Sequence, residues 1–134
     1  MKALFCYSHD KFCLQEVEVP AIGPSEMLIE MLLCGLCGSD IIKIFDPDSP
    51  KPAIYGHEVV GKVVKKGKQV SRFSIGDVVV AAHHIPCFKC HYCRHGNYSM
   101  CSQFRQTNIE PGGFSQYIKL SGHHINYTTF KLPP

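Results

Sequence analysis

The sequence predicts a mostly-β domain shaped as a partly closed barrel. Many short apolar runs of strand-like composition, turn residues between these runs, and a single short helical segment all indicate this class. The chain has 134 residues, which is enough for one domain with its own core, and no internal repeat divides it.

Three strands are expected before the pair Cys34 and Cys37. Apolar residues at strand spacing predict strands over 2–7 and 12–19, joined by a polar turn at Ser8–Lys11. The cluster Pro20–Pro24 breaks the second strand. Met27–Leu33 then forms a third strand that is apolar enough to be buried.

One short helix follows the third strand. Ser39 or Asp40 is expected to cap this helix, since hydroxyl and carboxylate side chains accept hydrogen bonds from the first helical N–H groups. The helix runs through Phe45, and Pro47 ends it.

The rest of the chain is expected to hold four more strands and one long loop. The loop, Pro86–Gln103, contains half of the cysteines. The expected strands are Gly56–Val64, Ile75–Ala82, Phe114–Leu120 and Ile125–Leu132.

Composition argues against several classes of protein. The formal charge is only +3, and the one dense basic group, Lys65 with Lys66 and Lys68, is typical of a solvated turn, so no nucleic-acid partner is expected. No apolar run approaches the roughly 18 residues of a membrane span, so no membrane partner is expected.

Eight cysteines are unusual for this length, and their even number raises the alternative of a secreted disulfide scaffold. Met1–Tyr7 is too short an apolar run for a signal peptide, and a chain of this size folds without disulfides. A cytoplasmic protein with reduced thiols is therefore predicted.

Four of these cysteines have the spacing of a structural zinc site. They read C-x2-C-x2-C-x7-C, and the residues are Cys87, Cys90, Cys93 and Cys101. Four thiolates satisfy tetrahedral zinc, and a bound metal offsets the entropy of ordering a loop without its own core. Two disulfides, free thiols or an iron–sulfur cluster are the alternatives. His91 and His95 lie between the cysteines as competing ligands.

A second group of residues has the composition of a catalytic zinc site. Cys37 lies between two turn glycines, and His57 and Glu58 follow about twenty residues later. Neighbours on a strand point to opposite faces, so both can approach one ion only if the chain distorts at Gly56. Three protein ligands and an open position would then result. A redox pair of Cys34 and Cys37 is a third interpretation.

Five ordered motifs together resemble the medium-chain zinc-dependent alcohol and polyol dehydrogenases. The motifs are Cys34-Gly-Leu-Cys-Gly-Ser-Asp40, Gly56-His-Glu-Val-Val-Gly61, Gly76-Asp-Val78, the four-cysteine loop, and Gly112-Gly-Phe-Ser-Gln-Tyr-Ile118. Within that family, the sequence is most similar in style to the sorbitol, threonine and secondary-alcohol branches. The resemblance implies a GroES-like barrel carrying one structural and one catalytic zinc, with hydride transfer to NAD(P).

The resemblance also implies roles for individual residues. Cys37 and His57 match the ligands of the catalytic zinc, and Glu58 matches a carboxylate that binds this zinc in some members or states. Asp40 matches the group that orients the ligand histidine, and Ser39 matches the hydroxyl that passes on the substrate proton. The four-cysteine loop matches the structural zinc site.

The sequence departs from the family pattern in two ways, one in the proton relay and one in cofactor binding. Ile42 stands where many relatives carry a relay histidine, and His83, His84 and the pair at 123–124 are weighed as replacements, with surface or packing roles favoured. No G-x-G-x-x-G motif or βαβ alternation occurs.

Residues 1–134 are therefore expected to be a GroES-like catalytic domain without its Rossmann cofactor domain, inactive alone. The expected partners are a small alcohol or polyol, the missing Rossmann domain and further copies in a homo-oligomer. The alternative is a stand-alone zinc-binding GroES-like interaction module without catalysis.

Overall fold

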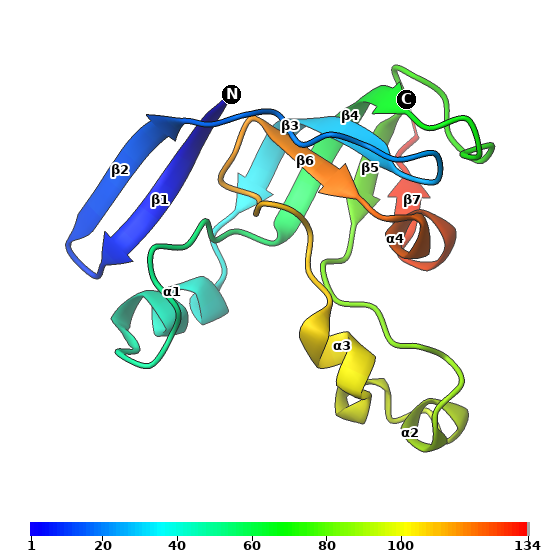
Figure 1. Ribbon diagram of the computed structural model, residues 1–134. Helices are drawn as coiled ribbons and strands as arrows, with labels where there is room; N and C mark the ends of the chain where they lie inside the picture. The colour runs from blue at the N-terminus through cyan, green and yellow to red at the C-terminus, as the bar shows by residue number, and fades with distance from the viewer. Residues whose placement is uncertain (134) are drawn as a thin grey trace.

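Two antiparallel sheets of unequal size organise the chain, whose computed structural model describes residues 1–133 (Figure 1). The smaller sheet is a hairpin of β1 (Lys2–Ser8) and β2 (Lys11–Glu16). The larger sheet has five strands in the order β6-β3-β4-β5-β7. These strands are β3 (Met27–Gly35), β4 (Glu58–Lys66), β5 (Val78–Ala81), β6 (Tyr117–Leu120) and β7 (Thr129–Lys131).

Short bridges join the hairpin to the rest of the molecule. Ala3 pairs with Ser115, and Cys6 pairs with Ala53, so β1 touches two segments that are distant in the sequence. Both sheets remain open, and the hairpin stands to one side of the five-stranded sheet in Figure 1. The expectation of a mostly-β, partly closed arrangement is confirmed.

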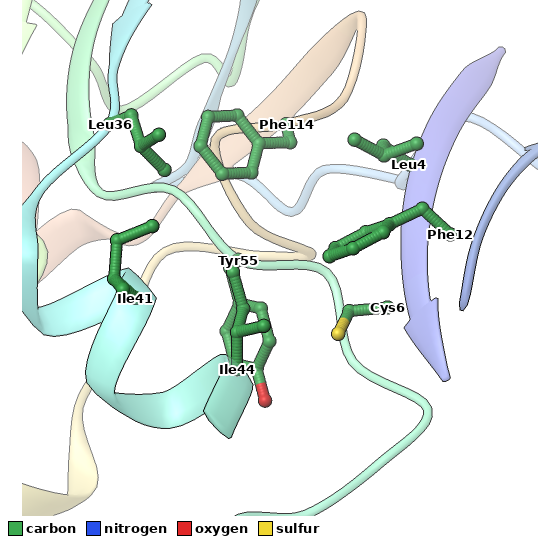
Figure 2. A pocket seen from close by; sticks show the side chains of 8 residues that line it. All are labelled: Leu4, Cys6, Phe12, Leu36, Ile41, Ile44, Tyr55 and Phe114. Atoms are coloured by element: carbon green, nitrogen blue, oxygen red, sulfur yellow. The ribbon is translucent and has the colours of Figure 1, made fainter. Parts of the chain in front are cut away.

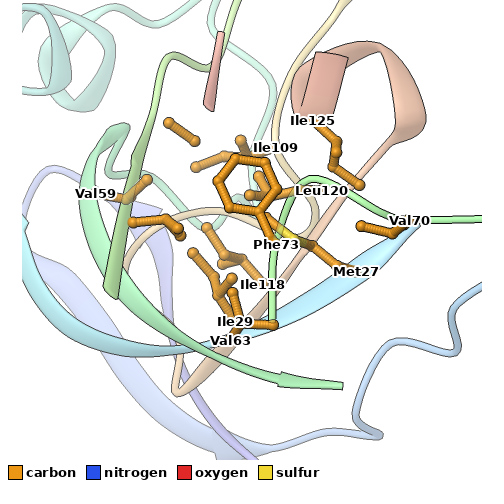
Figure 3. Packing of buried hydrophobic residues seen from close by; sticks show 12 residues of the cluster. Met27, Ile29, Val59, Val63, Val70, Phe73, Ile109, Ile118, Leu120 and Ile125 are labelled. Carbon is orange, nitrogen blue, oxygen red and sulfur yellow. The ribbon is translucent and has the colours of Figure 1, made fainter. Parts of the chain in front are cut away.

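One hydrophobic core lies against the five-stranded sheet (Figure 3). Strand alternation builds it: on β4, Val59 and Val63 are buried while Lys62 between them is exposed. The other fully buried side chains of this cluster are Met27, Ile29, Val79, Ile118 and Leu120. The loop residues Phe73 and Ile109 and the helical Ile125 close the cluster.

The structure contains more helix than the sequence predicted. The expected helix is α1 (Gly38–Phe45). The expected loop over 86–103 instead contains α2 (His91–Arg94) and a short 3-10 turn, η1 (Tyr98–Met100), and leads into α3 (Ser102–Gln106). Figure 1 shows α2 and α3 in a lobe that extends away from the sheets. We call residues 86–107 the cysteine lobe.

The prediction of a last strand over Ile125–Leu132 is wrong for its first half. That part lies in α4 (Gly122–Tyr127), and only Thr129–Lys131 forms a strand. Ser121 begins the helix because its hydroxyl accepts a hydrogen bond from the N–H of His124 at 3.4 Å.

Other boundaries were shifted. The second strand stops at Glu16, and β4 and β6 begin two and three residues later than expected, at Glu58 and Tyr117. The cap of α1 also differs from the expectation. Cys37 is the N-cap residue, and Asp40, three residues later, accepts a hydrogen bond from its N–H group at 3.0 Å.

Within residues 1–133, no helix combines the length and the apolar composition that crossing a bilayer requires.

Candidate metal centres

The four cysteines of the cysteine lobe converge. Their sulfur atoms all lie within 4.8 Å of one another, and they belong to Cys87, Cys90, Cys93 and Cys101. Local structure arranges them: Cys90 is the N-cap of α2, Cys93 lies inside that helix, and Cys101 is the N-cap of α3. All eight cysteines are unpaired in the structure, and no disulfide joins the four sulfurs of the lobe.

Backbone N–H groups point at these sulfurs. The N–H of Cys90 donates to Cys87 Sγ and that of Cys87 donates to Cys101 Sγ, each at 3.3 Å. The hydrogen bond from Cys87 is the main cause that lowers the pKa of Cys101 to about 6. Burial is the main cause that raises the pKa of Cys93 to about 12, and the hydrogen bonds with the other three thiols raise it further. Several thiolates can share this space only around a cation, so the donor set fits a zinc ion held by four sulfurs.

The second group lies where β3 leads into α1 and where β4 begins. One ligand atom from each of Cys37, His57 and Glu58 lies within 4.8 Å of the others. Gly56 has φ +88°, a left-handed conformation, and β4 begins only at Glu58. His57 therefore lies before the regular strand. For this reason His57 and Glu58, although adjacent in the chain, both reach Cys37, as the sequence analysis required.

Gly35 makes room for the carboxylate of Glu58. The two residues are opposite each other in the β3–β4 ladder. A Cβ atom at Gly35 would lie 2.3 Å from Oε2 of Glu58, which is closer than any real contact. A side chain at this position would therefore force the carboxylate of Glu58 to move from its present place.

Asp40 connects the segments that carry these side chains. It is 1% exposed, and its Oδ2 accepts from the N–H of Cys37 at 3.0 Å. Its Oδ1 accepts from the N–H of Gly56 and from Nδ1 of His57, each at 3.2 Å. Because an ionised carboxylate only accepts, Nδ1 of His57 carries the proton and Nε2 keeps its lone pair. This is the usual arrangement of a metal-binding histidine.

A hydroxyl group lies close to this imidazole. Ser39 Oγ is 3.4 Å from Nε2 of His57. The donor set of one sulfur, one nitrogen and one carboxylate oxygen, with a nearby hydroxyl, fits a zinc ion with an open position. Ile42, on the same helix as Ser39, is 71% exposed and offers no polar atom.

Histidines after β5 form one wall beside His57. The ring centroids of His57 and His83 are 4.3 Å apart, and those of His83 and His84 are 4.0 Å apart. Desolvation is the main cause that lowers the pKa of His83 to about 4, so this ring is neutral near pH 7. The ring of Phe104 continues the wall at 5.1 Å from His84. No sequence pattern marks Phe104 as part of this site, because its ring reaches His84 only through the folding of the cysteine lobe.

The other two histidines weighed as relay groups have packing roles. His124 is buried, and its Nε2 lies 3.0 Å from the carbonyl oxygen of His83. Nε2 of His123 lies 3.1 Å from the carbonyl oxygen of Pro86. Both therefore hold the segment after β5 in place, which agrees with the packing roles that the sequence analysis favoured for them.

Two hollows flank this region. An apolar cavity of about 360 Å³ lies between the hairpin and α1 (Figure 2). Its lining offers almost no polar atoms, and it consists of Leu4, Cys6, Phe12, Leu36, Ile41, Ile44, Tyr55 and Phe114. A second hollow of about 530 Å³ lies beside Glu58 on the outer face of the large sheet, where Leu33 and Phe130 are 70% and 59% exposed.

The fold and the two clusters together define a GroES-like β-domain with two separate groups of potential metal ligands. The family model for the alcohol dehydrogenase GroES-like domain matches residues 23–133. The chain belongs to this family.

The individual relatives are dehydrogenases of several kinds. The chain is 35% identical over 128 residues to L-threonine 3-dehydrogenase of Pyrococcus horikoshii, which covers 90% of this chain and 36% of that protein. It is 34% identical over 127 residues to sorbitol dehydrogenase of Bacillus subtilis, with the same shares covered. The chain thus spans little more than a third of the length of these relatives.

A solved structure supports the same assignment. The crystal structure of galactitol-1-phosphate dehydrogenase from Escherichia coli superposes with a TM-score of 0.83 at 31% identity. The superposition covers 99% of this chain and 38% of that one.

Proposed function

We propose that residues 1–134 are the GroES-like catalytic domain of a zinc-dependent dehydrogenase that oxidises a polyol or another secondary alcohol with NAD(P). The convergence of Cys37, His57 and Glu58, with Asp40 behind the imidazole, carries this proposal. The threonine and sorbitol dehydrogenases among the relatives favour substrates with a secondary hydroxyl group.

We assign a structural zinc to the cysteine lobe. Cys87, Cys90, Cys93 and Cys101 would hold it as thiolates. The lobe has little apolar core, so the metal would supply the free energy that orders it, on the order of 10 kcal/mol or more.

Cys37, His57 and Glu58 would hold a catalytic zinc. A zinc ion bound there supplies Lewis acidity, which lowers the pKa of an alcohol hydroxyl at the open position. Asp40 fixes the tautomer and the direction of His57, and it also holds the backbone of Cys37. The hydroxyl of Ser39, beside the imidazole, receives the proton that the alcohol loses and passes it outward. With Ile42 exposed and apolar, water or a hydroxyl of the cofactor must take that proton next.

The cofactor would be held by a Rossmann domain that is not part of residues 1–134. The sequence carries no G-x-G-x-x-G motif, and the relatives are almost three times as long as the matched segment. The apolar hollow beside Glu58, with Leu33 and Phe130 exposed, is a suitable surface for such a domain to cover. The eight free thiols favour a reducing compartment, which agrees with a cytoplasmic protein.

Metal analysis combined with substitution tests the proposal. We expect purified protein to bind one zinc at the cysteine lobe and a second, weaker zinc that His57→Ala removes alone. Residues 1–134 should show no turnover of sorbitol or threonine with NAD or NADP, because nothing positions the hydride acceptor. A protein that binds zinc only at the cysteine lobe, and whose zinc content is the same in variants of Cys37 and His57, would instead support the stand-alone module. Robust turnover by residues 1–134 would contradict the assignment of the cofactor to another domain.

A further inference from the structure

Two histidines of the cysteine lobe belong to neither candidate metal cluster. His91 is the first residue of α2, and His95 directly follows its last residue, so the two are one helical turn apart. Both are exposed, whereas Cys93 between them is buried. Their rings face each other on the solvent side, with centroids 4.5 Å apart and planes inclined by 40°.

The end of α2 fixes the direction of His95. Gly96 adopts a left-handed φ of +77° and stops the helix. The N–H of His95 therefore donates to the carbonyl of Tyr92, three residues back, at 3.2 Å. In a regular helix it would donate to the carbonyl of His91. The imidazole of His95 replaces its backbone N–H as the partner of this carbonyl, and its Nδ1 lies 2.8 Å from the carbonyl oxygen of His91.

This contact also fixes the proton on His95. A carbonyl oxygen only accepts hydrogen bonds, so Nδ1 carries the hydrogen and Nε2 keeps its lone pair. A histidine that ligates a metal through one nitrogen usually donates the other N–H to a carbonyl or carboxylate. His95 has this arrangement already, and the exposed ring of His91 lies beside it.

We propose that His91 and His95 form a surface site for one divalent transition-metal ion of the borderline class, such as Ni²⁺ or Zn²⁺. The two histidines are four residues apart and present their rings on one side of the chain, and four residues is the spacing at which helices bind such ions. Water completes the coordination, so the ion exchanges freely, unlike one held by four thiolates. The site is independent of the catalytic cluster and does not require the dehydrogenase assignment.

A nickel titration tests the site. The protein is first loaded with two zinc equivalents, one for each candidate cluster, and Ni²⁺ binding is then followed by calorimetry at pH 7.5. We expect His91→Gln and His95→Gln each to weaken the binding of one Ni²⁺ equivalent by at least about tenfold, because a single remaining imidazole has no chelate effect. His9→Gln is the matched control, since His9 is an exposed histidine on the hairpin turn. It should leave the affinity unchanged.

Two further measurements separate a lost site from a damaged lobe. Within residues 1–133 the side chain of His91 makes no hydrogen bond, so His91→Gln should retain the zinc of the lobe while losing Ni²⁺ affinity. Sub-stoichiometric Ni²⁺ should broaden the ring resonances of His91 and His95 before those of other histidines. Unchanged affinity in either variant, or Ni²⁺ broadening that spares the rings of His91 and His95, would overturn the proposal.

Discussion

The carboxylate of Asp40 lies 3.2 Å from Nδ1 of His57 and, through its other oxygen, 3.0 Å from the backbone nitrogen of Cys37. One buried side chain therefore positions two residues that are twenty positions apart in the sequence. It is also the N3 residue of α1, so the beginning of the helix and the geometry of the metal cluster depend on the same carboxylate.

Asp40→Asn should weaken metal binding at Cys37, His57 and Glu58 by about 10- to 100-fold. The amide keeps the size of the side chain but accepts on one side only, so it no longer fixes both His57 and Cys37. Cobalt titration with visible absorption measures the affinity at this cluster. Zinc in the cysteine lobe serves as the internal control and should not change; equal cobalt affinity in variant and parent protein would contradict the role of Asp40.

Cys90→Ser should remove one zinc equivalent and disorder the cysteine lobe. Three thiolates and a hydroxyl bind zinc far more weakly than four thiolates, and the lobe has no large core to replace the metal. Metal analysis and amide hydrogen exchange over residues 86–107 measure these changes.

Cys13→Ser, at an exposed thiol of β2, is the matched control for this substitution. It should retain both the zinc and the protection of the lobe. If Cys90→Ser kept the full zinc content, the four-sulfur site would be disproved.

Ile118→Ala should destabilise the domain by about 2–5 kcal/mol, because it leaves a cavity in the centre of the core. Ile118 is completely buried on β6. Leu14→Ala, on β2, should change the free energy of unfolding by less than about 0.5 kcal/mol, since Leu14 is 60% exposed. Urea denaturation at saturating zinc measures both; similar losses in the two variants would mean that the core assignment is wrong.

The stability of the protein should fall as the pH is lowered from about 6.5, in part through His124. Burial lowers the pKa of His124, and its two nitrogens already have partners in Ser121 and His83. The unfolded chain therefore binds a proton at a higher pH than the fold does, so stability is lost below the unfolded pKa of about 6.5. Urea unfolding between pH 7.5 and 5 measures this slope.

His124→Gln is the comparison for that experiment. It should be less stable than the parent at pH 7.5, because hydrogen bonds are lost, but its stability should decline less on acidification. Loss of metal at low pH affects both proteins alike and cancels in the difference. Parallel pH profiles would exclude His124 as a contributor.

Local patterns predicted most of the strands and the composition of both clusters. Alternating valines mark β4, and the spacing of cysteines marks the cysteine lobe, because both patterns depend on neighbours in the chain. The errors have a shared cause. The helix at Gly122–Tyr127 and the short helices of the lobe contain residues of weak propensity, and their form depends on contacts such as that of His124 with His83.

The sequence by itself determined which donor atoms are available: four thiols in one loop, and a thiol, an imidazole and a carboxylate in two motifs about twenty residues apart. Only the tertiary structure decided that Cys37, His57 and Glu58 meet, through the β3–β4 pairing and the buried carboxylate of Asp40. It alone placed His83 against His57 and turned His95 toward His91. The physical reason is that residue type sets the chemistry of a ligand, whereas distance and direction depend on how separate segments pack.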